Sequence, residues 1–385
     1  MNTTPLTSGE LVGLVRSVFP PRSGDRRLVL LVDYPAGPEQ DRPRWTARRE
    51  LAAEWGKILH REREKLGLEH VDRAGYAATG SNNADLPAAG VLLGETQPGS
   101  AAALESSGEA VELDALFNRT QIVIALTEFS ATAPLKLAAR VTGLRAATMP
   151  GFDERMLPAL RIDYGQVHDR VLAIKTRLDR AEIADVVFEV DGGDRCELRF
   201  DLRYREAHAS TGRFPEPGTA GNLPSGEAYI VPFEGRSGDP SRTRGLLPVQ
   251  IGGEVVVYRV RENRAVAVES RGAQSRSEAQ RLESEPAYGN MAELGFGVLA
   301  EFGLEPIGEI LLDEKLGFHI AFGRSDHFGG QVGPADFSSP AAVIHLDRIY
   351  IPATQPRVRV AALQLSGEPG PLITDGRLLY SPGGP

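Results

Sequence analysis

Imidazole and carboxylate side chains gather in one short window of the chain. Three of the seven histidines, His319, His327 and His345, lie there. The carboxylates of the same window are Glu309, Asp313, Glu314, Asp326, Asp336 and Asp347. Because zinc, cobalt, manganese and iron bind nitrogen and oxygen ligands together, the window predicts a metal centre.

The most informative part of the window is the segment AAVIHLDRIYIP, which contains His345 and Asp347. Its aliphatic and β-branched residues predict a strand, and residues two apart in a strand point to the same face. Leaving two such polar groups buried without partners costs about 1–3 kcal/mol each. One metal ion would satisfy both side chains. The alternative is an Asp–His pair that is hydrogen-bonded without an ion.

Three glutamates are further candidate ligands. Glu314 stands five residues before His319, which would put the two on opposite faces of an unbroken strand, but a turn at Gly317 would let both reach one centre. Glu309 and Glu227 each follow a glycine at the start of an apolar stretch. For either of these two glutamates alone, a surface position at the start of a strand is an equally good interpretation.

Several segments together resemble the aminopeptidase T family of metallopeptidases. They are GNLPSGEAYIVP, PIGEILLDEKLGFHIAFG, HFGGQV and AAVIHLDRIYIP, with a weaker match in LTEFSATAPLKLAARVTGLRAATMPGFDERML. The resemblance implies a centre of two divalent ions (zinc, cobalt, manganese or magnesium), a peptide substrate and a homodimer. The ligands that it implies are Glu227, Glu309, Glu314, His319, His345 and Asp347, with Glu227 or Glu309 as the catalytic general base.

Two features depart from the best-studied members of that family. Glu309 and Glu314 are nearly adjacent, as in a shorter branch of the family, and Asp326 stands where those members have a tyrosine seven residues after the histidine. The tyrosine hydroxyl could have oriented the substrate or donated a hydrogen bond to a developing oxyanion. The departure therefore concerns the substrate and the reaction more than the metal ligands.

The function that we expect is a metallo-aminopeptidase in which a water bound to two metal ions attacks the N-terminal peptide bond. One alternative is a ring-cleaving dioxygenase related to dihydroxypyridine dioxygenases, which would hold a single iron through His319, His345 and Asp347. Such a site has no need for three further glutamates. The second alternative is a relative that binds peptides without cutting them.

Composition excludes some other classes of protein. A formal net charge of -9 gives no attraction to nucleic acid or to anionic membranes. Cys196 is the only cysteine, so there is neither an intramolecular disulfide nor a thiolate zinc site, which favours a reducing compartment. The first residues lack the pattern of a signal peptide, and no apolar run reaches the length of a membrane span. We expect a cytoplasmic protein.

Hydrophobic periodicity predicts two domains. Over residues 1–164, buried strands (28–34, 122–129 and 144–149) alternate with helices, which is typical of an α/β domain with a largely parallel sheet. Over residues 165–385, a helix at 167–183 precedes alternating strands, which is typical of an α+β metal-binding domain with antiparallel strands. We expect a second helix over 277–303, broken at Pro286, and an aliphatic strand pair over 245–260 that a partner subunit covers.

Overall fold

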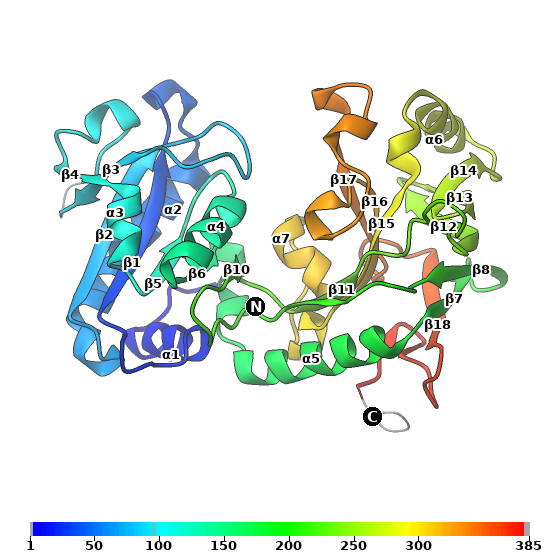
Figure 1. The fold of residues 1–385 in the computed structure, drawn as a ribbon, viewed down its shortest axis with the longest axis horizontal. Coiled ribbons are helices and arrows are strands. Elements are labelled where there is room, and N and C mark those ends of the chain that lie inside the picture. Colours follow the sequence, from blue (N-terminus) through cyan, green and yellow to red (C-terminus); the bar gives the residue numbers. More distant parts are fainter. Residues whose placement is uncertain (1–2, 95–96, 381–385) are drawn as a thin grey trace. The chain divides into compact units, whose positions relative to one another are not determined.

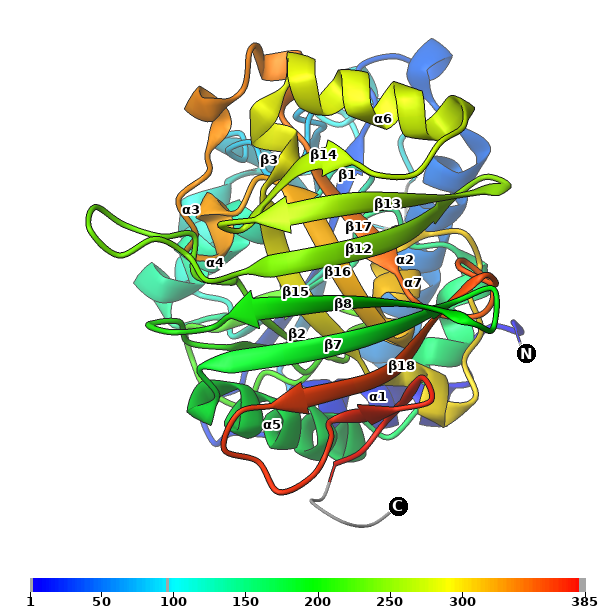
Figure 2. The ribbon, with the colours of Figure 1, turned by 90° about the vertical axis from the view of Figure 1, so that its right-hand side faces the viewer.

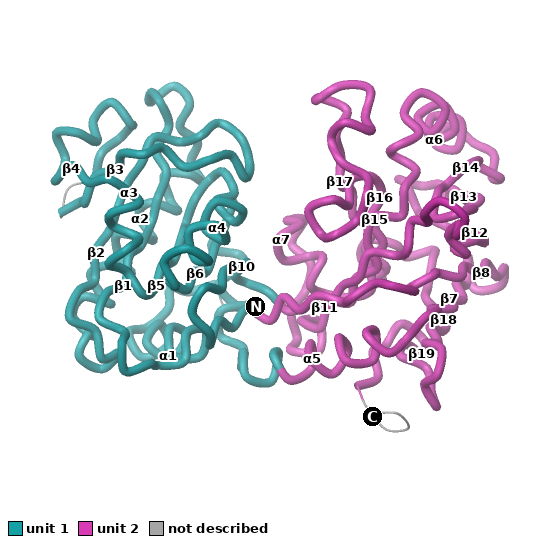
Figure 3. Tube along the Cα trace, viewed as in Figure 1, with its two compact units in different colours: residues 1–168, 212–225 teal, residues 169–211, 226–385 magenta. Residues whose placement is uncertain are grey.

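The computed structural model describes residues 3–94 and 97–380 (Figure 1). The chain forms two compact units (Figure 3). Unit 1 contains residues 1–168 and 212–225, and unit 2 contains residues 169–211 and 226–385. The chain therefore crosses between the units three times, whereas we expected a single boundary after residue 164.

Unit 1 is built on a seven-stranded sheet in the order β10-β6-β5-β1-β2-β3-β4. Neighbouring strands run parallel from β10 to β2, and β3 and β4 add an antiparallel edge. The strands are β1 (Arg27–Tyr34), β2 (His70–Ala77), β3 (Ala89–Leu93), β4 (Gly108–Glu112), β5 (Ile122–Ala125), β6 (Arg145–Thr148) and β10 (Ala220–Asn222). The sheet is thus largely parallel, as the alternation of strands and helices predicts.

Helices pack on the sheet of unit 1 and explain its apolar strands. They are α1 (Ser8–Val18), α2 (Pro43–Arg61), α3 (Leu113–Asn118) and α4 (Thr132–Thr142). Seven of the eight residues of β1 are buried, as in a strand covered on both faces. Helix α5 (Tyr164–Arg180) then leads into unit 2. None of the described helices has the length and apolar character that crossing a bilayer requires.

Unit 2 contains two antiparallel sheets. The five-stranded sheet has the order β17-β16-β15-β11-β9, and the eight-stranded sheet has the order β14-β13-β12-β8-β7-β18-β19-β20. The first comprises β9 (His208–Ser210), β11 (Glu227–Ile230), β15 (Met291–Gly297), β16 (Phe318–Gly323) and β17 (His345–Ile349). The second comprises β7 (Ile183–Val190), β8 (Asp194–Asp201), β12 (Arg244–Ile251), β13 (Glu254–Arg261), β14 (Arg264–Val268), β18 (Val358–Leu365), β19 (Ile373–Thr374) and β20 (Arg377–Leu378). The helices are α6 (Ala273–Ser284) and α7 (Ile310–Asp313).

The two sheets of unit 2 pack face to face (Figure 2). The ring of Phe322 in β16 lies 5.2 Å from that of Tyr258 in β13, and Tyr350, just after β17, lies 5.1 Å from Phe188 in β7. Because side chains alternate along a strand, the aromatic residues of FHIAFG point toward the eight-stranded sheet while His319 points the other way. One face of the five-stranded sheet is therefore core, and the opposite face is available for chemistry.

The expected helix over 277–303 is correct only in its first part. Helix α6 ends at Ser284, a short 3-10 helix covers Pro286–Gly289, and Met291–Gly297 is the strand β15. This strand pairs with both β11 and β16, so every one of its residues is buried. Tertiary pairing here outweighs the helical spacing of the apolar residues.

Arg145 joins three separate parts of unit 1 at the start of β6. Its side chain is 1% exposed, and Nη2 donates to both carboxylate oxygens of Asp25 at 2.8 Å. Nη1 donates to the carbonyl oxygens of Pro20 at 2.9 Å and Phe214 at 3.2 Å. Phe214 belongs to the segment that returns to unit 1, so this one side chain holds the returning segment to the N-terminal part.

We predict that Arg145→Met lowers the free energy of unfolding by about 3–5 kcal/mol, because it leaves the buried Asp25 carboxylate without its cation. Urea denaturation followed by circular dichroism measures the change. The control is Arg357→Met, which removes a similar bidentate pair with Asp191 on the exposed surface and should leave the denaturation midpoint nearly unchanged. Equal destabilisation by both variants would contradict this role for Arg145.

Candidate metal centre

Glycines on β15 make room for a histidine of the next strand. Glu293, Gly295 and Gly297 alternate along β15 and share one face. Gly295 lies opposite His319 of β16, and a Cβ added at Gly295 would be 2.0 Å from Nε2 of that imidazole. The ring therefore lies directly over the glycine, beside the carboxylate of Glu293.

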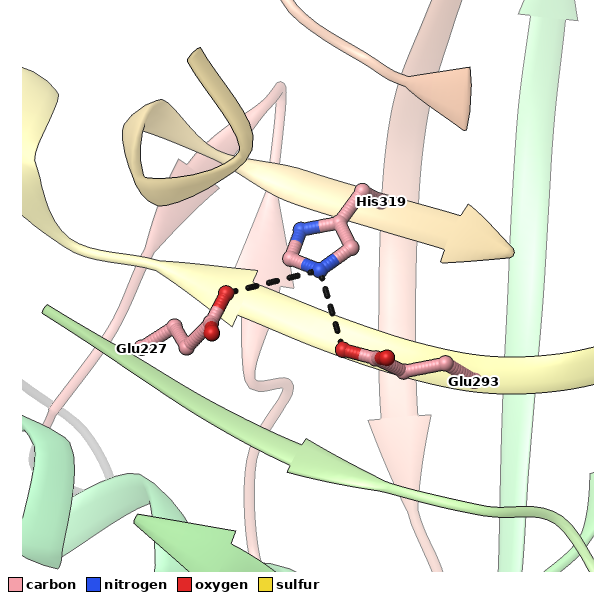
Figure 4. Close-up of side chains that lie close together, drawn as sticks. All are labelled: Glu227, Glu293 and His319. Carbon is pink, nitrogen blue, oxygen red and sulfur yellow. Dashed lines mark hydrogen bonds and ion pairs between the residues drawn. The ribbon is translucent and has the colours of Figure 1, made fainter. Parts of the chain in front are cut away.

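The first group of candidate ligands is Glu227, Glu293 and His319 (Figure 4). Nε2 of His319 is 3.3 Å from Oε1 of Glu293 and 3.6 Å from Oε2 of Glu227. All three side chains are buried, and Oε2 of Glu227 has no hydrogen-bond partner within the described residues. A buried carboxylate oxygen without a partner is costly, so the geometry fits a cation at this point.

The second group of candidate ligands is Glu293, His345 and Asp347. Nε2 of His345 is 3.3 Å from Oε2 of Glu293 and 3.6 Å from Oδ1 of Asp347. His345 and Asp347 share a face of β17, as alternation in a strand predicts. Glu293 thus gives one carboxylate oxygen to each group and stands between them.

Both histidines are oriented by backbone carbonyl oxygens. Nδ1 of His319 is 3.2 Å from the oxygen of Gly317, and Nδ1 of His345 is 2.8 Å from the oxygen of Arg324. A carbonyl only accepts, so Nδ1 carries the proton in each neutral ring and Nε2 is left to face Glu293. A ring nitrogen anchored in this way is typical of histidines that bind a metal through the other nitrogen.

The electrostatics of the two groups favour positive charge. Burial lowers the pKa of His319, but Glu293 and the other nearby carboxylates outweigh it and raise the pKa to about 9. The pKa of His345 is raised well above its usual value by Asp347 and Glu293, again against burial. Burial acts to raise the pKa of Glu293, but the two imidazoles hold it well below its usual range. Protons or divalent ions can supply the charge that these carboxylates require.

Lys315 is a fixed cation beside the first group. Its side chain is 2% exposed, and Nζ donates to Oε1 of Glu227 at 2.6 Å and to Oε1 of Glu314. Burial lowers the pKa of Lys315, but these two carboxylates outweigh it and raise the pKa above its usual value. Burial is the main cause that raises the pKa of Glu314 to about 8. Glu314 therefore contacts the ammonium of Lys315, which in turn contacts Glu227 of the first group.

Four of the six expected ligands, Glu227, His319, His345 and Asp347, belong to the two groups. Glu314 contacts Lys315, and Glu309 lies outside both groups at the residue before α7, where its backbone oxygen accepts from Leu312 and Asp313. The role of Glu309 as a ligand stays a prediction, since the structure places it at the start of α7 and in neither group.

Glu293 was not among the expected ligands, because its segment was interpreted as helix. The signal that would have identified it is the spacing of Glu293, Gly295 and Gly297 in MAELGFG, which puts one acid and two glycines on one face of a strand.

Asp326 and His327 lie outside the two groups. Asp326 begins the short 3-10 helix Asp326–Phe328 and accepts from Nε of Arg324 at 2.5 Å. The imidazole of His327 packs edge-on against that of His345 with ring centroids 5.2 Å apart. Burial and the neighbouring His345 lower the pKa of His327 to about 4, so this ring is neutral at physiological pH.

Comparison with known proteins finds similarity at the level of the fold. No family model matches the chain, and no curated protein matches it. A 2,5-dihydroxypyridine dioxygenase from Pseudomonas putida KT2440 has a similar structure, with a TM-score of 0.60, 15% identity and coverage of 97% of this chain and 98% of that chain. AmpT from Thermus thermophilus is also similar, with a TM-score of 0.53, 14% identity and the same coverage. The chain therefore shares its fold with two enzymes over nearly its whole length.

We predict that Gly295→Ala weakens the binding of a divalent ion by at least about tenfold, because the new methyl group displaces the imidazole of His319. Titration of the metal-free protein with Mn²⁺, followed by equilibrium dialysis, measures the effect. Gly13→Ala is the control, since a Cβ at that helical position has nothing within 4 Å. Unchanged Mn²⁺ binding by Gly295→Ala would show that His319 is not a ligand.

Proposed function

We propose that this chain is a metal-dependent hydrolase that releases N-terminal residues from peptides. The observation that carries the proposal is Glu293, whose two carboxylate oxygens belong to different groups of ligands. A carboxylate shared in this way would suit two divalent ions, with one oxygen for each, as in two-metal hydrolases. The imidazoles of His319 and His345 favour zinc, cobalt or manganese over magnesium, which prefers oxygen ligands.

The residues of the two groups have separate tasks in this mechanism. Two bound divalent ions supply a water of lowered pKa and polarise the scissile carbonyl. His319 and His345 present Nε2 in a fixed direction because backbone oxygens hold Nδ1. Of the two glutamates expected as general base, only Glu227 belongs to one of the two groups. Its Oε2 has no hydrogen-bond partner within the described residues. Glu227 therefore serves as a ligand of the first ion through Oε2, while Lys315 holds Oε1.

Two resemblances support a peptide as the substrate. The segments around Glu227, Glu314, His319 and His345 resemble the aminopeptidase T family, and the fold resembles AmpT from Thermus thermophilus. The acidic groups around the centre also favour the approach of a cationic peptide terminus.

The second candidate function is ring cleavage by a single iron, which the fold similarity to the 2,5-dihydroxypyridine dioxygenase favours. Its three ligands would be His319, His345 and Asp347. Among the described residues, however, His319 belongs to the group with Glu227, on Oε1 of Glu293. His345 and Asp347 belong to the group on Oε2 of Glu293. This division suits two ions better than one. A peptide-binding protein without activity is the third candidate, and it differs from the first only in turnover.

We predict that His345→Ala and Asp347→Ala each lose bound metal and peptidase activity together, because the second group then keeps only two of its three ligands. Elemental analysis and release of amino acids from short unblocked peptides measure the two properties. Unit 1 should remain folded, since none of these ligands belongs to it. Full metal content and turnover in His345→Ala would refute the assignment.

The matched control is His327→Ala, which removes an imidazole that packs on His345 but belongs to neither group. We expect this variant to keep its metal and to change at most the handling of the substrate. One iron per chain, with oxygen consumption on an aromatic diol, would instead establish the dioxygenase. Two bound ions without turnover on any peptide would favour the inactive relative.

A further inference from the structure

The ammonium of Lys315 lies between two carboxylates that could equally hold a divalent cation. Its Nζ is 2.6 Å from Oε1 of Glu227 and also contacts Oε1 of Glu314. These carboxylates come from separate parts of the chain, β11 and the turn before β16. Two buried carboxylates that converge on one point are a typical binding site for a divalent cation. Here an ammonium group of the chain itself is bound between them.

The backbone holds Lys315 firmly in this place. A Cβ added at Gly297 would lie 2.2 Å from the carbonyl carbon of Lys315, so the turn that carries the lysine packs directly on β15. The side chain is 2% exposed. A buried ammonium with two carboxylate partners is stable where it is and does not leave for solvent without a large cost.

The consequence differs between the two groups of ligands. Glu227 belongs to the first group and shares its negative charge with Lys315, which leaves only Oε2 facing His319. Glu293, His345 and Asp347 form the second group, and none of them has an ion pair with a lysine or arginine among the described residues. A cation at the first position shares Glu227 with the ammonium and is therefore repelled by it more strongly than a cation at the second position.

We propose that Lys315 makes the two metal positions unequal: the ion held by Glu293, His345 and Asp347 is retained, and the ion held by Glu227, Glu293 and His319 is weakly bound and exchangeable. In this arrangement Glu314 binds the ammonium of Lys315 and does not bind metal. The inference rests on the proposed two-metal site. It concerns the affinities for the ions and is independent of which substrate is hydrolysed.

The test is titration of the metal-free protein with Mn²⁺, with equilibrium dialysis for the dissociation constants and electron paramagnetic resonance for coupled ion pairs. In the wild type we expect one ion to bind at least about tenfold more tightly than the other. Lys315→Met should lower the dissociation constant of the weaker ion by at least about tenfold. The spectrum of the coupled ion pair should then appear at lower Mn²⁺ concentrations. His319→Ala should abolish binding of the weaker ion and leave binding of the tighter ion unchanged.

A second variant keeps the test decisive if Lys315→Met fails to fold, since that change leaves two buried carboxylates without a cation. Lys315→Met/Glu314→Gln removes the ammonium together with one of its two carboxyl partners and still frees Glu227 from Lys315, so the weaker ion should bind more tightly in it as well. Lys175→Met is the matched control. Lys175 also lies between two carboxylates, 2.6 Å from Asp179 and 3.5 Å from Glu206, but on α5 away from the ligands.

Each outcome has one meaning. The proposal is supported if the weaker Mn²⁺ ion binds more tightly in both Lys315 variants and its affinity is unchanged in Lys175→Met. Equal affinities in the wild type, or a weaker second ion in the Lys315 variants, overturns it and makes Lys315 a residue that only positions Glu227. Absence of Mn²⁺ binding in the wild type would overturn the proposed metal-dependent function itself.

Discussion

Buried carboxylates that lie close together require positive charge, and unit 2 is organised around this requirement. Glu227, Glu293, Glu314 and Asp347 converge on two imidazoles and one ammonium. Coulomb repulsion between like charges is large at such short range in a medium of low dielectric constant. The fold supplies part of the compensation through Lys315, and the rest must come from protons on the histidines or from metal ions. The crowding that is costly for folding is also what makes this cluster a candidate site for cations.

The position of these groups depends on how the five-stranded sheet divides its residues between its faces. In β16, Phe318, Ile320 and Phe322 face the eight-stranded sheet, and His319, Ala321 and Gly323 face the other way. Small residues on this second face let the imidazole and the turn before β16 lie close against β15. Apolar burial on one face thus fixes the register that brings the polar groups of β11, β15, β16 and β17 together on the other.

Local sequence patterns predicted the parts of this arrangement that depend on neighbours along the chain. The pairing of His345 with Asp347 follows from strand alternation, and the parallel sheet of unit 1 follows from apolar strands between helices. Glu293 was missed because the apolar residues around it also have helical spacing, and only its two flanking strands decide for β15. The contact of Lys315 with Glu227 joins residues 88 positions apart, so no local pattern contains it.

The path of the chain between the units decides where Glu227 enters the five-stranded sheet. Segment 212–225 returns to unit 1, where β10 pairs with β6, and the chain then enters unit 2 again at residue 226. Glu227 is the next residue, whereas His319 and His345 lie about a hundred residues further along inside unit 2. Glu227 opens β11, where it pairs with Gly297 of β15 and Ser210 of β9, and Lys315 also holds its carboxylate. The strand ladder and the ion pair therefore fix this candidate ligand within one residue of the point where the chain re-enters unit 2.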